Sequence, residues 1–230
     1  MKTSVIIPAA GVGTRFGGDV PKQYIEIDGE PILIKTIKLF DKIDDVEDIV
    51  IAVHTEKFTY TEELVKKYNC TKVKEIIIGG KQRQDSVFAA LRSKIVQDSE
   101  ITLIHDAVRP FASLNLIQRL INAAEEYGAA IPVIPINDTI KEINHKGFVE
   151  KTLDRNKLVL VQTPQAYWTD IVTDAYKKGQ QANFEGTDSA SFVEFLGYKV
   201  YVVDGEYNNL KITRETDIQY AKIISEGKIL

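Results

Sequence analysis

The chain has little sulfur and no surplus of positive charge. Its 230 residues include one cysteine, Cys70, so an intrachain disulfide is excluded. No signal peptide is recognisable at the start, and together with the lone thiol this predicts a reducing cytoplasm. The 29 basic and 33 acidic side chains give a net charge of −4. This balance argues against general binding to nucleic acid or to an anionic membrane, because both favour a basic surplus. Cations for an anionic substrate must therefore be concentrated at one place.

Long apolar runs are absent too. The longest, at residues 5–10 and 129–136, are far shorter than the roughly 20 residues that a membrane-spanning helix needs. No internal repeat recurs, and the 44% hydrophobic and 27% charged residues are ordinary for a globular protein. A chain of this length predicts one domain, residues 1–230, with a well-buried core and one small subsidiary element.

Apolar strand-like segments alternate with amphipathic segments along most of the chain. This alternation predicts an α/β fold of Rossmann-like type, in which a mostly parallel sheet is flanked by helices. The expected strands are residues 4–10, 49–54, 75–78, 102–105, 158–162 and 199–203. The expected helices are residues 31–42, 59–68, 84–96, 114–127, 169–178, 188–195 and 216–226.

A polar β-hairpin is predicted between residues 139 and 152. There Ile140 and Ile143 are interleaved with charged residues, and the turn-like segment 145–147 follows,. Two polar strands have little core of their own and are marginally stable in water. We therefore expect this β-arm, at about 137–155, to project from the domain and to pair with a second copy in a symmetric homodimer. The alternative is a surface hairpin that packs on its own domain.

A glycine-rich loop follows the first predicted strand, with the sequence PAAGVGTRFGGDVPK at 8–22. Small residues let a ligand approach the backbone, whose N–H groups can surround phosphate oxygens. A dinucleotide fingerprint is excluded because Phe16 occupies the third glycine position, and a P-loop because Asp19 follows the last glycine,. Arg15 and Lys22 place two cations on this loop, which suits charge development on phosphorus and on a leaving pyrophosphate. The alternative is a solvated Lys22 and an Arg15 paired with a nearby carboxylate.

Six further blocks accompany this loop in order along the chain. They are GGKQRQDSV at 79–87, HDAVRPF at 105–111, NDTIK at 137–141, DRNKLVLVQTPQA at 154–166, GTDSAS at 186–191 and NLKIT at 209–213. With the loop, which extends through Gln23 and Tyr24 as the block PAAGVGTRFGGDVPKQY at 8–24, they make the chain resemble the sugar-phosphate nucleotidyltransferases. The resemblance to the 2-C-methyl-D-erythritol 4-phosphate cytidylyltransferase family runs nearly end to end. The resemblance implies cytidylyl transfer from CTP to 2-C-methyl-D-erythritol 4-phosphate, which gives 4-diphosphocytidyl-2-C-methyl-D-erythritol and pyrophosphate in non-mevalonate isoprenoid precursor synthesis.

The resemblance also implies site residues. It implies catalytic roles for Arg15, Lys22, Arg155 and Lys211. The residues expected to contact CTP are Ala9, Ala10, Gly11, Gly13, Gly80, Ser86, Asp106 and Ala107. The second substrate would meet Arg109, Thr139, Arg155, Thr163, Thr187 and Lys211. Mg²⁺ or another divalent cation is expected mainly on CTP phosphates, since Mg²⁺ takes few protein ligands, with Asp106 the candidate carboxylate. In a dimer with exchanged arms, Thr139 and Arg155 would reach the partner's site.

Two other functions stay open at this point. Ribitol 5-phosphate cytidylyltransferases share the loop and the Arg-Pro motif. The segments 83–87 and 187–194 favour the erythritol family, whereas Val108 and residues 205–213 are shared with, or lean toward, the ribitol family. A non-catalytic nucleotide-binding dimer is the alternative from another class. The three histidines, His54, His105 and His145, lie on unrelated predicted elements, so core, loop or turn roles are expected for them.

Overall fold

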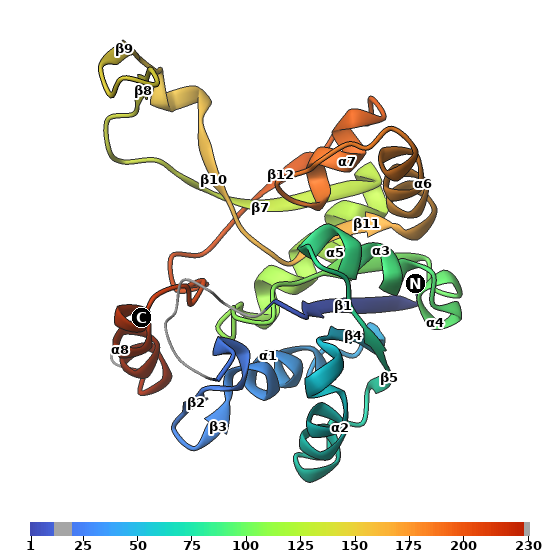
Figure 1. Cartoon of the computed structure of the whole chain (residues 1–230). Helices are drawn as coiled ribbons and strands as arrows, with labels where there is room; N and C mark the ends of the chain where they lie inside the picture. Colours follow the sequence, from blue (N-terminus) through green and yellow to red (C-terminus); the bar gives the residue numbers. More distant parts are fainter. Residues whose placement is uncertain (12–19, 228–230) are drawn as a thin grey trace.

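An eight-stranded, mostly parallel sheet forms the centre of the computed structural model, which describes residues 1–11 and 20–227 (Figure 1). The strand order is β10-β7-β11-β6-β1-β4-β5, and β12 pairs with β7. The bounds are β1 (Thr3–Ala9), β4 (Val46–Val53), β5 (Val73–Ile78), β6 (Ile101–Ile104), β7 (Ala129–Pro135), β10 (Val159–Val161), β11 (Gln165–Trp168) and β12 (Tyr201–Asp204). Strands β6, β1, β4 and β5 are mutually parallel, whereas β10 and β11 run antiparallel to their neighbours.

Helices cover both faces of this sheet, because its central strands are apolar on both sides. In β1, Val5 and Ile7 belong to one fully buried cluster and Ile6 to another. The first cluster packs under α1 (Ile32–Asp41), α2 (Phe58–Lys67) and α5 (Leu114–Tyr127). The second packs under α3 (Arg83–Leu91), α4 (Lys94–Gln97), α6 (Thr169–Gln181) and α7 (Ser189–Phe195). The predicted α/β architecture is therefore confirmed.

A third, small cluster joins the C-terminal helix to the body. Helix α8 (Glu215–Ser225) contributes Ala221, which is buried with Ile27 and Ile212. Ile27 belongs to a short antiparallel pair, β2 (Glu26–Ile27) and β3 (Glu30–Pro31). No helix in the part of the chain that the structure describes is long and apolar enough to cross a membrane.

The polar hairpin is present as predicted and forms a sheet of its own. Among the described residues, strands β8 (Lys141–Ile143) and β9 (Val149–Thr152) pair only with each other, and η3 (Arg155–Lys157) follows them. Every residue of both strands is exposed. In Figure 1 this β-arm stands clear of the sheet and its helices, joined to them by the extended chain that leads out of β7 and back into β10.

Two sequence predictions need correction. The single helix expected over residues 84–96 is two helices, α3 and α4, because the Ser93 hydroxyl accepts from the Ile95 N–H and starts a new helix,. Strands β7 and β11 were not among the predicted strands, although both lie inside the sheet. Residues 129–136 were recognised only as an apolar run. The sequence of β11 does not show a strand pattern because Gln165, a polar residue, is fully buried there. Its amide is hydrogen bonded to Asp188 (2.7 Å) and accepts from Tyr167 (2.8 Å).

Candidate active site

One cavity of about 350 Å³ lies where the carboxyl ends of β1, β5 and β6 meet. Parallel strands end at the same edge of a sheet, and ligands of open α/β folds bind at that edge. Nine sequence-predicted residues line it: Ala9, Ala10, Gly11, Lys22, Gly80, Ser86, Asp106, Ala107 and Lys211. Gly13 and Arg15 lie outside the described residues. The structure thus brings most of the predicted nucleotide-binding set into one place.

The segment after β5 requires small residues. A Cβ added at Gly80 would lie 2.2 Å from the Cβ of Asp85, and one at Gly79 would lie 2.5 Å from the Cβ of Ala10. The Ser86 hydroxyl accepts from the Gly80 N–H (3.1 Å) and donates to the Gln82 carbonyl (3.2 Å). The backbone of this cavity wall is therefore fixed by close packing and by a side chain of α3.

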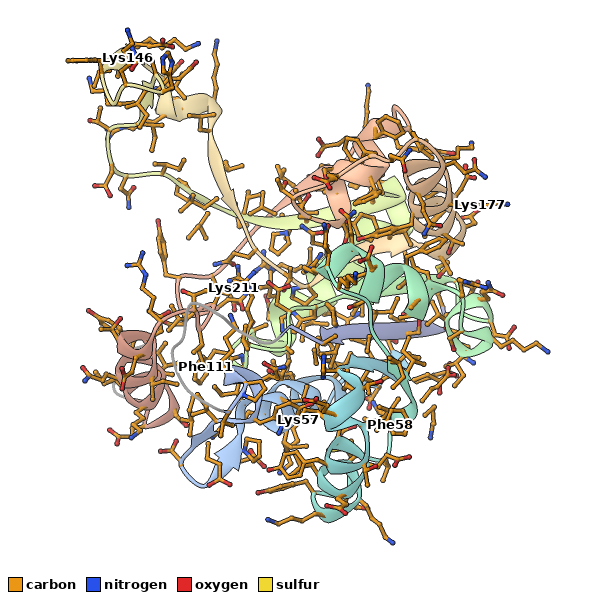
Figure 2. The ribbon with its side chains drawn as sticks, viewed as in Figure 1. Lys57, Phe58, Phe111, Lys146, Lys177 and Lys211 are labelled. Atoms are coloured by element: carbon orange, nitrogen blue, oxygen red, sulfur yellow. The ribbon has the colours of Figure 1, made fainter. Side chains whose placement is uncertain are left out.

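Three cations surround the carboxylate of Asp106 at the end of β6. Arg83 Nε lies 2.9 Å from Oδ1, Lys211 Nζ 2.7 Å from Oδ2, and Arg109 Nε 3.7 Å from Oδ2. Burial raises the pKa of Asp106, but the three cations outweigh it, so this pKa lies well below its usual value,. With one negative and three positive groups, the cluster keeps a surplus of positive charge. Lys211 is labelled at the centre of Figure 2, on the segment that precedes α8.

A buried hydrogen-bond chain holds the backbone that carries Asp106. Burial lowers the pKa of His105 to about 4, so its ring is neutral near pH 7,. Its Nε2 donates to the Arg109 carbonyl (2.9 Å), which leaves Nδ1 to accept from the Thr163 hydroxyl (3.0 Å),. The same hydroxyl accepts from the Asp106 N–H (3.0 Å). His105 therefore orients a loop, the role expected for it from the sequence.

Three predicted acceptor residues are not part of the cavity lining. Arg109 and Thr163 are buried and adjoin the cavity through their contacts with Asp106. Arg109 Nη1 also donates to the Asn209 carbonyl (2.7 Å). Thr187 is exposed and directly precedes Asp188, whose carboxylate caps α7 by accepting from the Ser191 N–H (3.0 Å).

The two arm residues of the predicted set lie away from this cavity. Thr139 precedes β8, and Arg155 begins η3, where its guanidinium donates to the Asn137 carbonyl. Neither lines the cavity of its own chain. Figure 2 shows Lys146 at the tip of the β-arm, far from Lys211. Within one chain, Thr139 and Arg155 therefore lie apart from the predicted residues that line the cavity.

Arg83 is a site residue to which the sequence reasoning assigned no role. It lines the cavity, contacts Asp106 and donates through Nη1 to the Ser189 hydroxyl (3.3 Å). It thereby links the start of α3 to the loop after β6 and to the start of α7. The block at 79–87 contains it, but no spacing rule connects it to Asp106, which lies 23 positions away.

A protein-only metal site is not evident in residues 1–11 and 20–227. These residues contain no group of three His, Cys, Asp or Glu side chains that could hold an ion. Asp106 is the only carboxylate among the described lining residues, and both of its oxygens already face cations. The donor set fits a divalent cation that is held mainly by a ligand's own phosphate oxygens.

A larger groove of about 810 Å³ lies between α1, α8 and the turn after β12. Lys35, Lys38 and Lys42 line one wall, and Phe111 and Tyr207 lie on others. None of the predicted site residues that the structure describes lines this groove. Size alone therefore does not identify the site, and the smaller cavity is the one that gathers the predicted chemistry.

Comparisons with known proteins agree with this geometry. Residues 3–226 match the family model described as IspD, 2-C-methyl-D-erythritol 4-phosphate cytidylyltransferase. The enzyme of that name from Clostridium novyi is 42% identical, with 98% of this chain and 97% of the relative covered. The one from Syntrophus aciditrophicus is 40% identical, with 99% of both chains covered. Among solved structures, the 4-diphosphocytidyl-2C-methyl-D-erythritol synthase from Anaerococcus prevotii is similar, with a TM-score of 0.84, 31% identity, and coverage of 98% of this chain and 96% of that one.

Proposed function

The chain belongs to the 2-C-methyl-D-erythritol 4-phosphate cytidylyltransferase family, and on that premise we propose how its residues carry out the family's reaction. The enzyme transfers a cytidylyl group from CTP to 2-C-methyl-D-erythritol 4-phosphate in isoprenoid precursor synthesis. Ribitol 5-phosphate is not the favoured acceptor, because the family model and the relatives named above carry methylerythritol in their names. The observation that carries our proposal is the convergence of Lys22, Lys211, Asp106 and the backbone of residues 9–11 and 80 on one cavity.

The reaction needs no side-chain nucleophile. A phosphate oxygen of the acceptor attacks the α-phosphorus of CTP, a new P–O bond forms, and the bond to the β-phosphate breaks as pyrophosphate leaves. The acceptor phosphate is already anionic near pH 7, so no proton has to be removed by a base. Catalysis then consists of positioning two polyanions and stabilising the charge that develops between them.

We assign the nucleotide to the wall formed by residues 9–11, Gly80, Ser86, Asp106 and Ala107, together with Gly13 from the segment outside the described residues. Lys22, with Arg15 from the segment outside the described residues, would stabilise charge on the α-phosphate and the leaving pyrophosphate. The surplus positive charge of Arg83, Arg109 and Lys211 around Asp106 supports placement of the acceptor phosphate next to them. Lys211 is the cation of that cluster with the most exposed side chain, so it is the one we assign to the phosphate itself.

Mg²⁺ or a similar cation would enter with CTP, held by triphosphate oxygens, with Asp106 the one described lining carboxylate near it,. When bound, it would neutralise part of the triphosphate charge. We also place the enzyme in the cytoplasm, a proposal that rests on the single, buried Cys70,.

The second substrate would be held by two chains. Arg109, Thr163, Thr187 and Lys211 would come from one protomer, and Thr139 and Arg155 from the β-arm of its partner in a homodimer. Two observations support this arrangement: both arm residues lie outside their own cavity, and the arm exposes Ile143 (63%), Phe148 (69%) and Val149 (59%). Apolar side chains exposed together on a projecting hairpin are suited to burial against a second copy.

Mixing two impaired variants, assayed at an acceptor concentration well below the wild-type KM, tests the exchanged arms. Lys22→Ala damages the body of a site and Arg155→Ala damages the arm. If arms are exchanged, a mixed dimer contains one site with both changes and one site with neither. Random mixing should then restore activity to about one quarter of the wild-type value, since half of the dimers are mixed. No recovery, with mixed dimers confirmed by differential tags, would show that each arm serves its own chain.

An acceptor assay tests the function directly. The protein is incubated with each of the four nucleoside triphosphates, Mg²⁺ and either methylerythritol phosphate or ribitol phosphate, and pyrophosphate is measured. We expect release with CTP and methylerythritol phosphate, and a much lower kcat/KM with ribitol phosphate. A higher kcat/KM with ribitol phosphate would overturn the choice of acceptor, while the assignment of CTP would stand.

A further inference from the structure

Gln23 is a buried amide that the reaction as described does not use. It lies in the short 3₁₀ turn η1 (Lys22–Tyr24), directly after Lys22, and it is only 3% exposed although it lines the cavity. Its Nε2 lies 2.7 Å from the Ala9 carbonyl oxygen and 3.0 Å from the Gly11 carbonyl oxygen. Because a primary amide carries two N–H donors, both of them are committed to this one stretch of backbone.

These two hydrogen bonds join the Ala9–Gly11 backbone, which is assigned to the nucleotide, to the turn that carries Lys22. Ala9 and Gly11 flank Ala10 at the carboxyl end of β1, where the backbone is assigned to the nucleotide. In a trans peptide the N–H of one residue points away from the preceding carbonyl. The bond to the Ala9 carbonyl therefore also fixes the direction of the Ala10 N–H. The backbone of η1, closed by the Tyr24 N–H to Pro21 carbonyl bond (2.9 Å), carries Lys22 next to the same amide.

We propose that Gln23 is a positioning residue for cytidylyl transfer, which sets Lys22 and the Ala9–Gly11 backbone at a fixed separation around the CTP phosphates. The inference rests on the proposed role of Lys22. A misplacement of about 1 Å at a reacting centre can lower a rate about 100-fold, and a cation that acts on developing charge is sensitive to such a shift. Gln23 itself contacts neither substrate in this proposal.

The test is Gln23→Met, which keeps the length and volume of the side chain and removes both donors. We expect kcat to fall by about 30-fold and the KM for CTP to rise a few-fold. The KM for methylerythritol phosphate should stay within about twofold, because the acceptor's residues lie elsewhere. Gln118→Met is the matched control: Gln118 on α5 also donates twice through Nε2, to Asp45 (2.7 Å) and Asn122 (3.1 Å), but lies outside the cavity. It should leave all three constants unchanged.

A double-mutant cycle separates positioning from a general loss of structure. If Gln23 acts through Lys22, then Gln23→Met in a Lys22→Ala background should lower kcat by less than about threefold. An additive loss in the double variant, or a Gln23→Met enzyme with wild-type kcat, would overturn the inference. If Lys22→Ala alone keeps the wild-type kcat, the proposed role of Lys22 fails instead, whatever Gln23 does. Gln23→Glu offers a second readout, since its oxygens would face two carbonyl oxygens and should lower kcat further than Met.

Discussion

The cavity and the β-arm differ in where their polar side chains find partners. Around the cavity, Asp106 contacts three cations of its own chain, and Ser86, His105 and Thr163 are hydrogen bonded within it. In the arm, every residue of β8 and β9 is exposed, and within residues 1–11 and 20–227 the two strands pair only with each other. The cavity is thus organised by one chain alone. The arm carries residues that, in our proposal, act only when a second chain is present.

The sharpest test of the cavity is Lys22→Ala. If Lys22 stabilises charge that develops during transfer, kcat should fall about 1,000-fold, equivalent to about 4 kcal/mol, while the KM for CTP changes only a few-fold. Steady-state kinetics of pyrophosphate release measures both constants. Lys42→Ala, which removes a lysine that follows α1 and lies outside the cavity, is the control and should have no effect. A loss confined to KM would mean that Lys22 contributes to CTP binding and not to the transition state.

Removing one carboxylate should lower the free energy of unfolding much more at Asp106, beside the cavity, than at Asp154 in the arm. Asp106→Asn removes the one negative charge among three cations in a buried cluster, so we expect a loss of about 3 kcal/mol in the free energy of unfolding. Asp154→Asn is the counterpart in the arm, where the carboxylate caps η3 by accepting from the Asn156 N–H (3.1 Å). Asparagine caps as well as aspartate, so this change should cost less than about 0.5 kcal/mol. Urea unfolding of the free proteins measures both, and equal losses would contradict the proposed contrast.

Arg155→Ala should weaken binding of the acceptor and leave binding of the nucleotide unchanged. If Arg155 of the partner's arm helps to hold the anionic acceptor, as proposed, its loss predicts a rise of about 30-fold in the KM for methylerythritol phosphate, or about 2 kcal/mol, with the KM for CTP unchanged. Lys151→Ala removes another arm cation, which is paired with Glu142 (2.8 Å), and serves as the control. An effect on CTP alone would refute the assignment of Arg155 to the acceptor.

The elements that a sequence pattern could predict are those with a local signal. The apolar strands β1, β4, β5 and β6 and the loops after three of them were predicted, and those loops do meet at one cavity. The hairpin was predicted from the alternation of Ile140 and Ile143 with charged residues. A continuous apolar run indicates a strand that is covered on both faces, and alternation with charged residues indicates strands exposed to solvent, so neither prediction needs a distant contact.

The contacts that could not be predicted join residues distant in sequence. Strand β11 has no apolar pattern, since Gln165 is buried through hydrogen bonds and not through apolar packing. Arg83 meets Asp106 only because α3 and the loop after β6 lie at the same sheet edge. The family resemblance supplied most of the site residues, and their roles stay predictions until the variants are measured. Neither pattern nor resemblance indicated that Gln23 would lie with both donors on the backbone of Ala9 and Gly11.

The smallest effect is expected at Gly147, and it tests whether the two regions need glycine for different reasons. Gly80 is required for space, whereas Gly147 has nothing within 4 Å of an added Cβ but adopts φ of +84° at the arm's turn. Gly147→Ala should therefore destabilise only the hairpin, by about 1 kcal/mol. Gly147→Asn should cost less, because asparagine tolerates this conformation. Hydrogen exchange of β8 and β9 amides measures the effect, with β1 amides as the internal reference. Faster exchange in β1 as well would mean that the arm is coupled to the body within one chain, and the contrast between the regions would fail.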